Sequence, residues 1–254
     1  PKALRDFLTE NAILQDGACI NRKTGNKIKA VMPVHTFGQP LRISEIKGIC
    51  DDFNLILIED CAESLGSFYD QTHTGRFGKV GLFSFNGNKI ITTGGGGMLV
   101  TDDPNIANRA RHISTTAKKP HEYEFIHDEV GYNYRMPNLN AALGCAQMKR
   151  LPRILNSKLD VHLSYKKFFE GSEVRFISSV EQTKSNHWLN AVVFECMDDR
   201  EHFLKKCIES GIQCRPAWRL MTDLPMFANC QSDAQLNSRY FVERLVCLPS
   251  SAII

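Results

Sequence analysis

Leu55-Ile-Leu-Ile-Glu-Asp60 decides the fold, because an uninterrupted apolar run ends directly in two carboxylates. An earlier run, Lys29-Ala-Val-Met-Pro-Val-His35, is also largely apolar and is followed by the turn residues Phe37-Gly-Gln-Pro40. Between these runs, apolar residues at helical spacing from Ile43 to Phe53 predict an amphipathic helix. Strand, helix and strand at this spacing predict a βαβ unit with a parallel sheet. Ligands of such sheets bind beyond the carboxyl ends of the strands, which is where Asp60 falls.

The remaining segments predict two domains of different character. We expect strands over 80–85 and 98–101, a helix over 105–113, a polar connection over 115–134, and a long helix over 138–155 with Pro152 near its end. After 156 the pattern changes to a helix over 158–169, strand-like stretches at 174–177 and 188–195, and a helix over 199–210. The sequence thus predicts a partial α/β large domain over 1–155 and a partial, smaller α+β domain over 156–254.

Composition limits the class of protein. The chain has 254 residues, 43% apolar and 23% charged, with a formal net charge of +3 and no block of like charges. These values favour a globular protein and give no reason to expect a nucleic-acid or membrane partner. The nine cysteines are scattered without a C-x-x-C pair, so we expect reduced thiols in a cytoplasmic protein and no metal site.

Lys89 is the first candidate for chemistry. It lies in Ser84-Phe-Asn-Gly-Asn-Lys-Ile-Ile-Thr-Thr-Gly-Gly-Gly-Gly97, among apolar neighbours and glycines. Most lysines are solvated, and the glycine run lacks the order of a phosphate loop, so a flexible turn is the simpler interpretation of the glycines. Burial, however, lowers the pKa of a lysine and makes its amine a nucleophile toward carbonyls.

Asp60 has two interpretations that the residues alone leave open. A carboxylate at a strand end often caps a following helix, here from Ala62 onward. Alternatively, it faces the protonated ring nitrogen of pyridoxal phosphate (PLP) and keeps that electron sink active.

Five stretches, taken in order, resemble the DegT/DnrJ/EryC1/StrS family of PLP-dependent nucleotide-sugar aminotransferases. They are Pro33-Val-His-Thr-Phe-Gly38, Ile58-Glu-Asp-Cys-Ala-Glu-Ser-Leu-Gly66, Gly75-Arg-Phe-Gly78, Phe83-Ser-Phe-Asn-Gly-Asn-Lys-Ile-Ile-Thr-Thr-Gly94 and Gly131-Tyr-Asn-Tyr-Arg-Met-Pro-Asn-Leu-Asn-Ala-Ala-Leu-Gly144. The resemblance implies the aspartate-aminotransferase fold (PLP fold type I), with a mostly parallel sheet in the large domain. The amino-acid sequence at 86–89, 115–118 and 127–131 is most similar to that of the legionaminic-acid-pathway branch of the family.

The resemblance also implies roles for individual residues around the cofactor. Lys89 would form the Schiff base and move the proton between cofactor and substrate carbons, and Asp60 would pair with the pyridine nitrogen. Glu63 would lie near the ring hydroxyl, with an exposed helix carboxylate as the alternative. Ser84 would contact the phosphate, although it is equally a strand residue without a role.

Asn133 would reach the cofactor phosphate of a neighbouring subunit, since these enzymes build each site across a homodimer interface; the alternative is a plain turn residue. His35 could face the site or be a buried, hydrogen-bonded structural histidine. His121, Tyr123 and His127 are candidates for substrate contacts because their loop is long and polar, and a solvated loop is the alternative.

The function implied is transfer of an amino group from glutamate to the 4-keto carbon of a UDP-4-keto-6-deoxy-N-acetylhexosamine in surface-sugar biosynthesis. Family members that dehydrate have histidine at the position of Lys89, so the lysine favours amination over a PLP-dependent sugar dehydratase. Because the chain starts at Pro1, we expect a fragment that is incomplete at its N-terminus and lacks part of the phosphate site. An inactive fragment that serves only as a folded or interaction piece is the other alternative.

Overall fold

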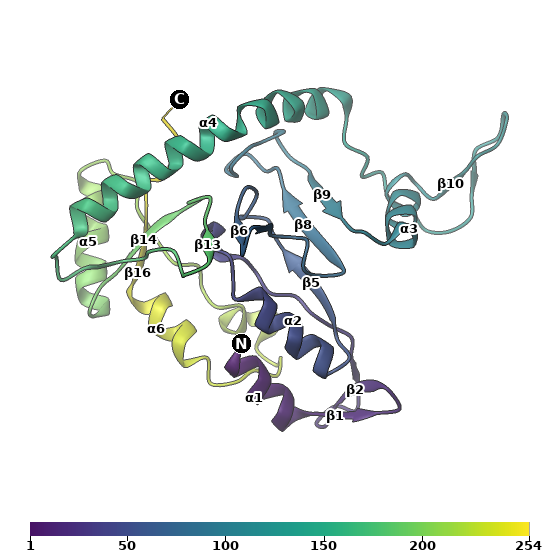
Figure 1. Cartoon of the computed structure of the whole chain (residues 1–254), viewed down its shortest axis with the longest axis horizontal. Helices are drawn as coiled ribbons and strands as arrows, with labels where there is room; N and C mark the ends of the chain where they lie inside the picture. Colours follow the sequence, from purple (N-terminus) through teal and green to yellow (C-terminus); the bar gives the residue numbers. More distant parts are fainter. Residues whose placement is uncertain (254) are drawn as a thin grey trace.

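Two main sheets organise the molecule, and one long helix runs past both of them (Figure 1). The structure is a computed structural model that describes residues 1–253. The helices are α1 (Lys2–Asn11), α2 (Ile43–Asp52), α3 (Pro104–Ser114), α4 (Asn138–Phe169), α5 (Met197–Glu209) and α6 (Leu236–Arg244), with short 3₁₀ turns at Thr36–Gly38, Met221–Asp223 and Pro225–Phe227.

The strands of the first half are β1 (Ala12–Gln15), β2 (Ala18–Asn21), β3 (Lys27–Ile28), β4 (Ala30–Val31), β5 (Ile56–Asp60), β6 (Phe68–Tyr69), β7 (Thr72–His73), β8 (Val80–Ser84) and β9 (Gly97–Val100). Those that follow are β10 (Lys118–Lys119), β11 (Ile126–His127), β12 (Arg175–Phe176), β13 (Thr183–Lys184), β14 (Asn190–Val193), β15 (Arg215–Pro216) and β16 (Leu245–Leu248).

The first main sheet has the strand order β4-β5-β8-β9. Its first two pairings are parallel and the last, β8 with β9, is antiparallel. The mostly parallel sheet and the βαβ unit are therefore confirmed. Since β5 ends at Asp60 and β8 ends at Ser84, and Asp60 pairs with Leu82, the ends of these strands meet at one edge of the sheet. This edge is where a doubly wound sheet binds its ligand.

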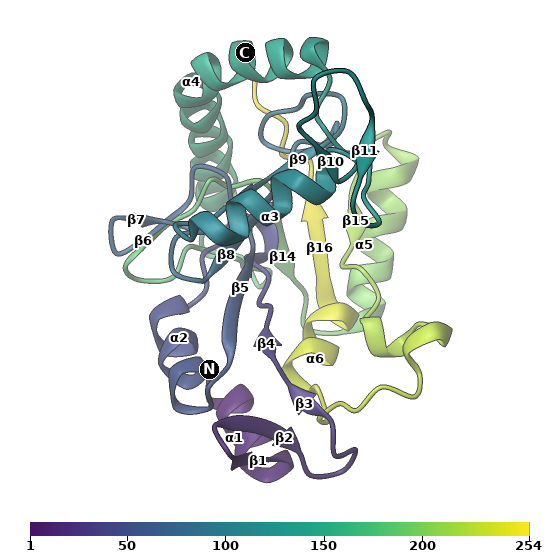
Figure 2. The same cartoon turned by 90° about the vertical axis from the view of Figure 1, so that its right-hand side faces the viewer.

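Helix α2 covers part of this sheet because its apolar stripe has the helical period. Ile43, Ile46 and Ile49 are all buried, and they pack with Leu57 of β5 in one core cluster. Figure 2 shows α2 alongside β5. The same cluster includes Leu8 of α1, so the N-terminal helix belongs to this core.

The second main sheet, β12-β14-β16-β15, is antiparallel throughout. All four residues of β14 and all four of β16 are buried, because both faces are covered. On one face α5 packs through Leu204 and Cys207, and on the other Phe37 and Leu189 contribute. Tyr165 and Phe169 at the end of α4 pack against the same cluster as α5. The division into two domains at 155/156 stays a prediction.

Helix α4 differs from the prediction in one respect. It is a single helix of 32 residues, whereas the sequence predicts one helix over 138–155 and a separate one over 158–169. Proline lacks an N–H and disfavours a helix interior, yet Pro152 lies inside this helix. Here Ile154, just past the proline, is buried with Ile90 and Ile91, so packing keeps the helix intact.

Short strands account for two segments that the sequence left without structure. A meander of β1, β2 and β3 follows α1, and the hairpin β10–β11 lies within the polar connection 115–134. None of the helices formed by residues 1–253 is long and apolar enough to cross a membrane.

A stacked pair of histidines joins α4 to the second sheet. The rings of His162, on α4, and His187, just before β14, lie with centroids 3.8 Å apart and planes within 24°. His162 also bonds through Nδ1 to Asn190 Oδ1 at 2.7 Å. Burial lowers the pKa of both rings, and repulsion from His162 and Lys158 helps to bring the pKa of His187 to about 4.

This depressed pKa predicts acid sensitivity. The unfolded chain takes up a proton near the ordinary value of 6.5 and the folded chain only near 4, so stability falls as the pH drops through this window. The difference corresponds to a loss of about 3 kcal/mol for His187. Urea unfolding across this pH range should show a shallower pH dependence in His187→Asn, because asparagine does not titrate. Asparagine also tolerates the positive φ of 51° at this position. Parallel pH profiles for the two proteins would contradict the assignment.

Candidate active site

The loop between β8 and β9 presents Lys89 at the ligand-binding edge of the first sheet. The backbone N–H of Phe85 donates to Gly96 O at 2.9 Å, and that of Thr93 donates to Phe85 O at 3.1 Å, which closes the loop. Ile90 and Ile91 bury their side chains in the core cluster that includes Ile154 of α4. The loop is therefore anchored by the residues directly after Lys89.

The amine of Lys89 lies in a partly buried site with one carboxylate beside it. Its side chain is 14% exposed, and Nζ lies 3.7 Å from Glu63 Oε1. Nζ also lies 4.1 Å from the ring centroid of Trp188. Lys89 and Trp188, together with Lys158 and Trp218, line a cavity of about 440 Å³. The expectation that Lys89 is a partly buried rather than a solvated lysine is confirmed.

Glu63 is held in place by the backbone of Phe37. The N–H of Phe37 donates to Glu63 Oε2 at 2.6 Å, from a residue with a φ of 62°. Burial raises the pKa of Glu63, against the Phe37 bond and the Lys89 charge, which both lower it. Glu63 lies in a turn and its side chain is 15% exposed, so the alternative of an exposed helix carboxylate is wrong.

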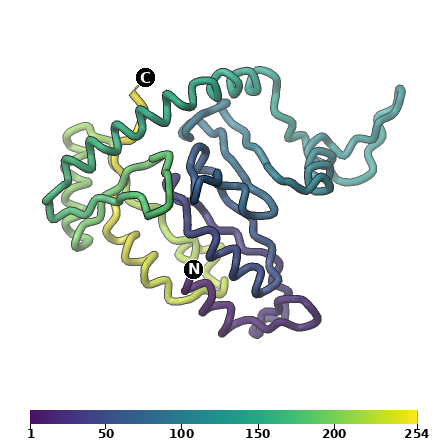
Figure 3. The backbone as a smooth tube through the Cα atoms, viewed as in Figure 1, coloured from purple at the N-terminus to yellow at the C-terminus, as the bar shows by residue number. Residues whose placement is uncertain are grey.

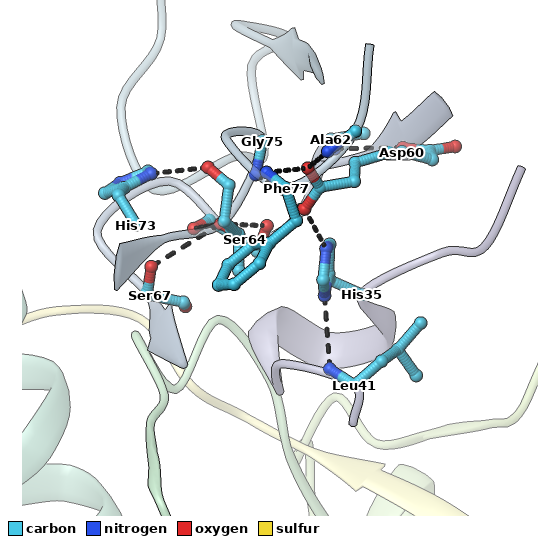
Figure 4. Close-up of polar contacts among 12 residues, drawn as sticks. His35, Leu41, Asp60, Ala62, Ser64, Ser67, His73, Gly75 and Phe77 are labelled. Atoms are coloured by element: carbon cyan, nitrogen blue, oxygen red, sulfur yellow. Dashed lines mark hydrogen bonds and ion pairs between the residues drawn. The ribbon is translucent and has the colours of Figure 1, made fainter. Parts of the chain in front are cut away.

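Asp60 ends β5 and is half-buried. Its Oδ1 accepts from the N–H of Ala62 at 2.9 Å, as Figure 4 shows, but residues 61–66 form turns and no helix starts there. The helix-cap interpretation is therefore wrong, and the bond closes a local turn instead. Asp60 lies near enough to Glu63 to contribute to its raised pKa. The structure thus brings Lys89, Glu63 and Asp60 into one neighbourhood.

His35 lies in the interior, with both ring nitrogens occupied by protein partners. It is fully buried; Nδ1 accepts from the N–H of Leu41 at 3.2 Å, so Nε2 carries the proton and donates to Glu59 Oε2 at 3.1 Å (Figure 4). This geometry favours the alternative of a structural histidine over a substrate contact.

Glu59 is a buried carboxylate whose importance the sequence did not reveal. It accepts three backbone N–H bonds, from Gly75 at 2.8 Å and from Phe77 and Gly78 at 2.7 Å each, besides the bond from His35. Burial alone would raise the pKa of Glu59, but these bonds outweigh it and hold the pKa below its ordinary value. The strand-end pair Glu59-Asp60 therefore has one structural member and one member at the site.

The other predicted cofactor contacts lie apart from one another. Ser84 ends β8, and its Oγ accepts from the N–H of Asn86 at 3.3 Å, which places it at the start of the Lys89 loop. Asn133 is exposed and pairs with Thr115 in an isolated bridge beyond α3.

The predicted substrate contacts of the polar connection lie on a projecting hairpin. His121 and Tyr123 lie between β10 and β11, where their rings meet edge to face at 5.0 Å. Tyr123 is 79% exposed. His127, in β11, bonds through Nδ1 to Thr116 O at 2.7 Å. The hairpin and the second sheet lie at opposite ends of the molecule (Figure 3).

Trp188 and Trp218 are the site residues that sequence reasoning missed. Their rings are parallel within 2°, with centroids 6.2 Å apart, and both line the Lys89 cavity. The one available signal was their scarcity, because these are the only two tryptophans in the chain. A larger, mostly apolar cavity of about 730 Å³ lies between α4 and the β8–β9 pair, but neither Lys89 nor Glu63 lines it.

Comparison with known proteins identifies the family. The profile of the DegT/DnrJ/EryC1/StrS aminotransferase family matches residues 10–253, almost the whole chain. The protein is a member of this family. EpsN of Bacillus subtilis (strain 168) is 34% identical over 236 residues, covering 91% of this chain and 61% of that protein. The GDP-perosamine synthase of Escherichia coli O157:H7 is 35% identical over 209 residues, covering 82% of this chain and 57% of that enzyme.

Solved structures show the same fold at lower identity. PseC of Helicobacter pylori, an aminotransferase involved in the biosynthesis of pseudoaminic acid, superposes with a TM-score of 0.84 at 21% identity, covering 90% of this chain and 63% of PseC. The sugar aminotransferase Spr1654 of Streptococcus pneumoniae in its PLP form gives a TM-score of 0.79 at 21% identity, covering 88% of this chain and 64% of Spr1654. The PLP fold type I is therefore confirmed. The chain spans about three fifths of the length of the curated relatives and solved structures cited here.

PLP is the cofactor of this family, and the residues around Lys89 suit it. A primary amine, 14% exposed and 3.7 Å from a carboxylate oxygen, is the group that an aldehyde cofactor requires. Asp60 and Glu63 supply two acidic groups near that amine. These are the residues that would hold the cofactor's ring polar atoms.

The network around Glu59 predicts a large effect of a small change. Glu59→Gln replaces one acceptor oxygen with an NH₂ group that meets two donors, so we expect a loss of about 3 kcal/mol in the free energy of unfolding. The wild type should also lose stability as the pH falls through the depressed pKa of Glu59, and the variant should lack this component.

Urea unfolding measures both effects. Glu45→Gln is the matched control, since Glu45 is exposed and forms only an i,i+3 ion pair with Arg42. Its effect should stay within about 0.5 kcal/mol. Equal losses in the two variants would contradict the role assigned to Glu59.

Proposed function

We propose that the protein containing this chain is a PLP-dependent nucleotide-sugar aminotransferase. The observation that carries this proposal is the amine of Lys89, partly buried in a cavity beside the carboxylate of Glu63. Family membership supports it, as does the identity of residue 89, because a lysine favours amination over dehydration.

Each site residue then has a chemical task. PLP, when bound, supplies an electron sink that stabilises negative charge on the substrate carbon. Lys89 Nζ would hold the cofactor covalently and, once released from it, would move a proton between two carbon atoms. Asp60 would pair with the ring nitrogen of the cofactor, and Glu63 would hold the ring hydroxyl. Because burial raises the pKa of Glu63, its carboxyl group retains a proton to higher pH and can then donate a hydrogen bond.

For the substrate, we propose a 4-keto nucleotide sugar, with glutamate as the amino donor. The sequence at 86–89 and 127–131, which resembles the legionaminic-acid-pathway branch, supports a UDP-4-keto-6-deoxy-N-acetylhexosamine as the substrate. Two relatives, at 34–35% identity, are named GDP-perosamine synthases, which makes a GDP-linked sugar the competing candidate.

A homodimer with shared sites is the proposed assembly. Asn133 and Tyr123 are exposed, and the β10–β11 hairpin, which includes Tyr123, projects from the rest of the chain (Figure 1). In this position they are available to the site of a second copy. Ser84, by contrast, would serve the cofactor phosphate within its own chain.

Lys89→Ala tests the proposed chemistry. With PLP and borohydride, the wild type should be labelled at Lys89 and the variant should not. Turnover in the intact protein should fall by a factor on the order of 10³ or more. Lys47→Ala is the control, because Lys47 lies exposed on α2 with Asp51 as its partner. Retained turnover in Lys89→Ala would refute the assignment.

The choice of substrate is tested with glutamate and the two 4-keto sugars offered separately. Consumption of one glutamate per sugar aminated, with the UDP-linked sugar preferred, is the expected result. Conversion of a sugar without glutamate consumption would indicate a dehydratase instead. A colourless protein that does not take up PLP would support an inactive folded piece.

A further inference from the structure

The indole ring of Trp188 lies directly beside the amine of Lys89. The Nζ atom lies 4.1 Å from the centroid of the indole ring, within the range of a cation–π interaction. The side chain of Lys89 is 14% exposed and Trp188 is 4% exposed, so little water screens the contact. The amine therefore has two neighbours at close range, the indole of Trp188 and the carboxylate of Glu63.

The indole is fixed on the side of the lysine loop. Its Nε1–H donates to the carbonyl of Asn88, the residue directly before Lys89, at 2.7 Å. This bond joins two residues that are 100 positions apart in the chain. The orientation of the ring is thereby set by the same backbone that carries the amine.

A second anchor connects Trp188 to the loop of Glu63. The backbone N–H of Trp188 donates to Asn186 Oδ1 at 2.9 Å. The amide nitrogen of Asn186 in turn donates to the carbonyls of Glu63 at 2.7 Å and Leu65 at 2.9 Å. Trp188 is thus bonded to both segments that flank the reacting amine.

The third anchor is Lys158 of α4, whose ammonium has an unusual environment. It is 6% exposed and donates to the carbonyl of Trp188 at 2.8 Å and to that of Ser250. No carboxylate within residues 1–253 forms an ion pair with it, and burial lowers its pKa to about 8. A buried cation with only carbonyl partners is costly, and here its bonds fix the backbone of Trp188.

We propose that Trp188 is the positioning residue of Lys89: its indole face holds the amine in the cavity beside Glu63, and Asn88, Asn186 and Lys158 hold the indole. The inference rests on the proposed function, in which Lys89 is the reacting group. It assigns a task to a residue that lies 99 positions after Lys89 in the chain.

Two effects of opposite sign follow from Trp188→Leu. Without the indole face, the amine is uncovered and its charged form loses a favourable contact. Reaction with trinitrobenzenesulfonate, which needs only a free amine, should therefore become about three- to thirtyfold faster at Lys89. Attachment of PLP, which needs the amine in one place, should become slower by about tenfold.

The experiment measures both rates in the cofactor-free protein, with each lysine followed by peptide mass spectrometry. Trp188→Phe keeps an aromatic face and loses the bond to Asn88, so its rates should fall between those of the wild type and Trp188→Leu. Phe125→Leu is the matched control: it removes the ring under Lys118, 4.2 Å from that amine, and should leave Lys89 unchanged.

The reactivity of Lys158 shows whether a variant loosens the fold in general, because Lys158 is buried in the wild type. If Trp188→Leu also exposes Lys158, the decision falls to Trp188→Phe, in which Lys89 alone should react faster. Unchanged reactivity of Lys89 in both variants overturns the inference. If the wild type takes up no PLP but Lys89 reacts faster in Trp188→Leu, the positioning stands and the proposed function fails.

Discussion

The buried carboxylate of Glu59 is the constraint on which the site depends. Four donors converge on it, three of them backbone N–H groups of the segment 75–78 that leads into β8. Side chains alternate along a strand, so fixing Glu59 inward directs Asp60 to the other face of β5. The two consecutive carboxylates therefore have different roles: Glu59 binds backbone groups in the interior, and Asp60 is available to a ligand.

Local sequence patterns predicted the part of the structure in which local rules prevail. The βαβ unit was predicted from a continuous apolar run and from apolar residues spaced with the helical period of 3.6. Strand β5 ends at Asp60, as expected. Lys89 and Glu63 were assigned to one cofactor by the resemblance to the family and not by a local pattern, and their roles stay predictions. The predicted break in helix α4 after 155 was wrong, because Ile154, Lys158 and His162 are buried along one continuous helix and packing outweighs the local pattern.

Other features could not be found from one sequence because they are contacts across long separations. Trp188 meets the Lys89 loop only when the chain has returned from the far side of α4. Glu59 looked like the companion of Asp60, since nothing in an acidic dipeptide says which carboxylate points inward. The roles of Asn133, His121 and Tyr123 stay predictions: His121 and Tyr123 lie in the connection between β10 and β11, and Asn133 bridges Thr115 after α3.

Helix α4 links the two sheets mechanically. Its middle touches the lysine loop through Ile154, its next turn holds Trp188 through Lys158, and its end enters the second core through Tyr165. At about 48 Å long, it acts as a lever between these points. Any rotation of one sheet against the other must either carry Lys89 and Trp188 along together or bend the helix, and the missing N–H of Pro152 makes that turn the natural hinge.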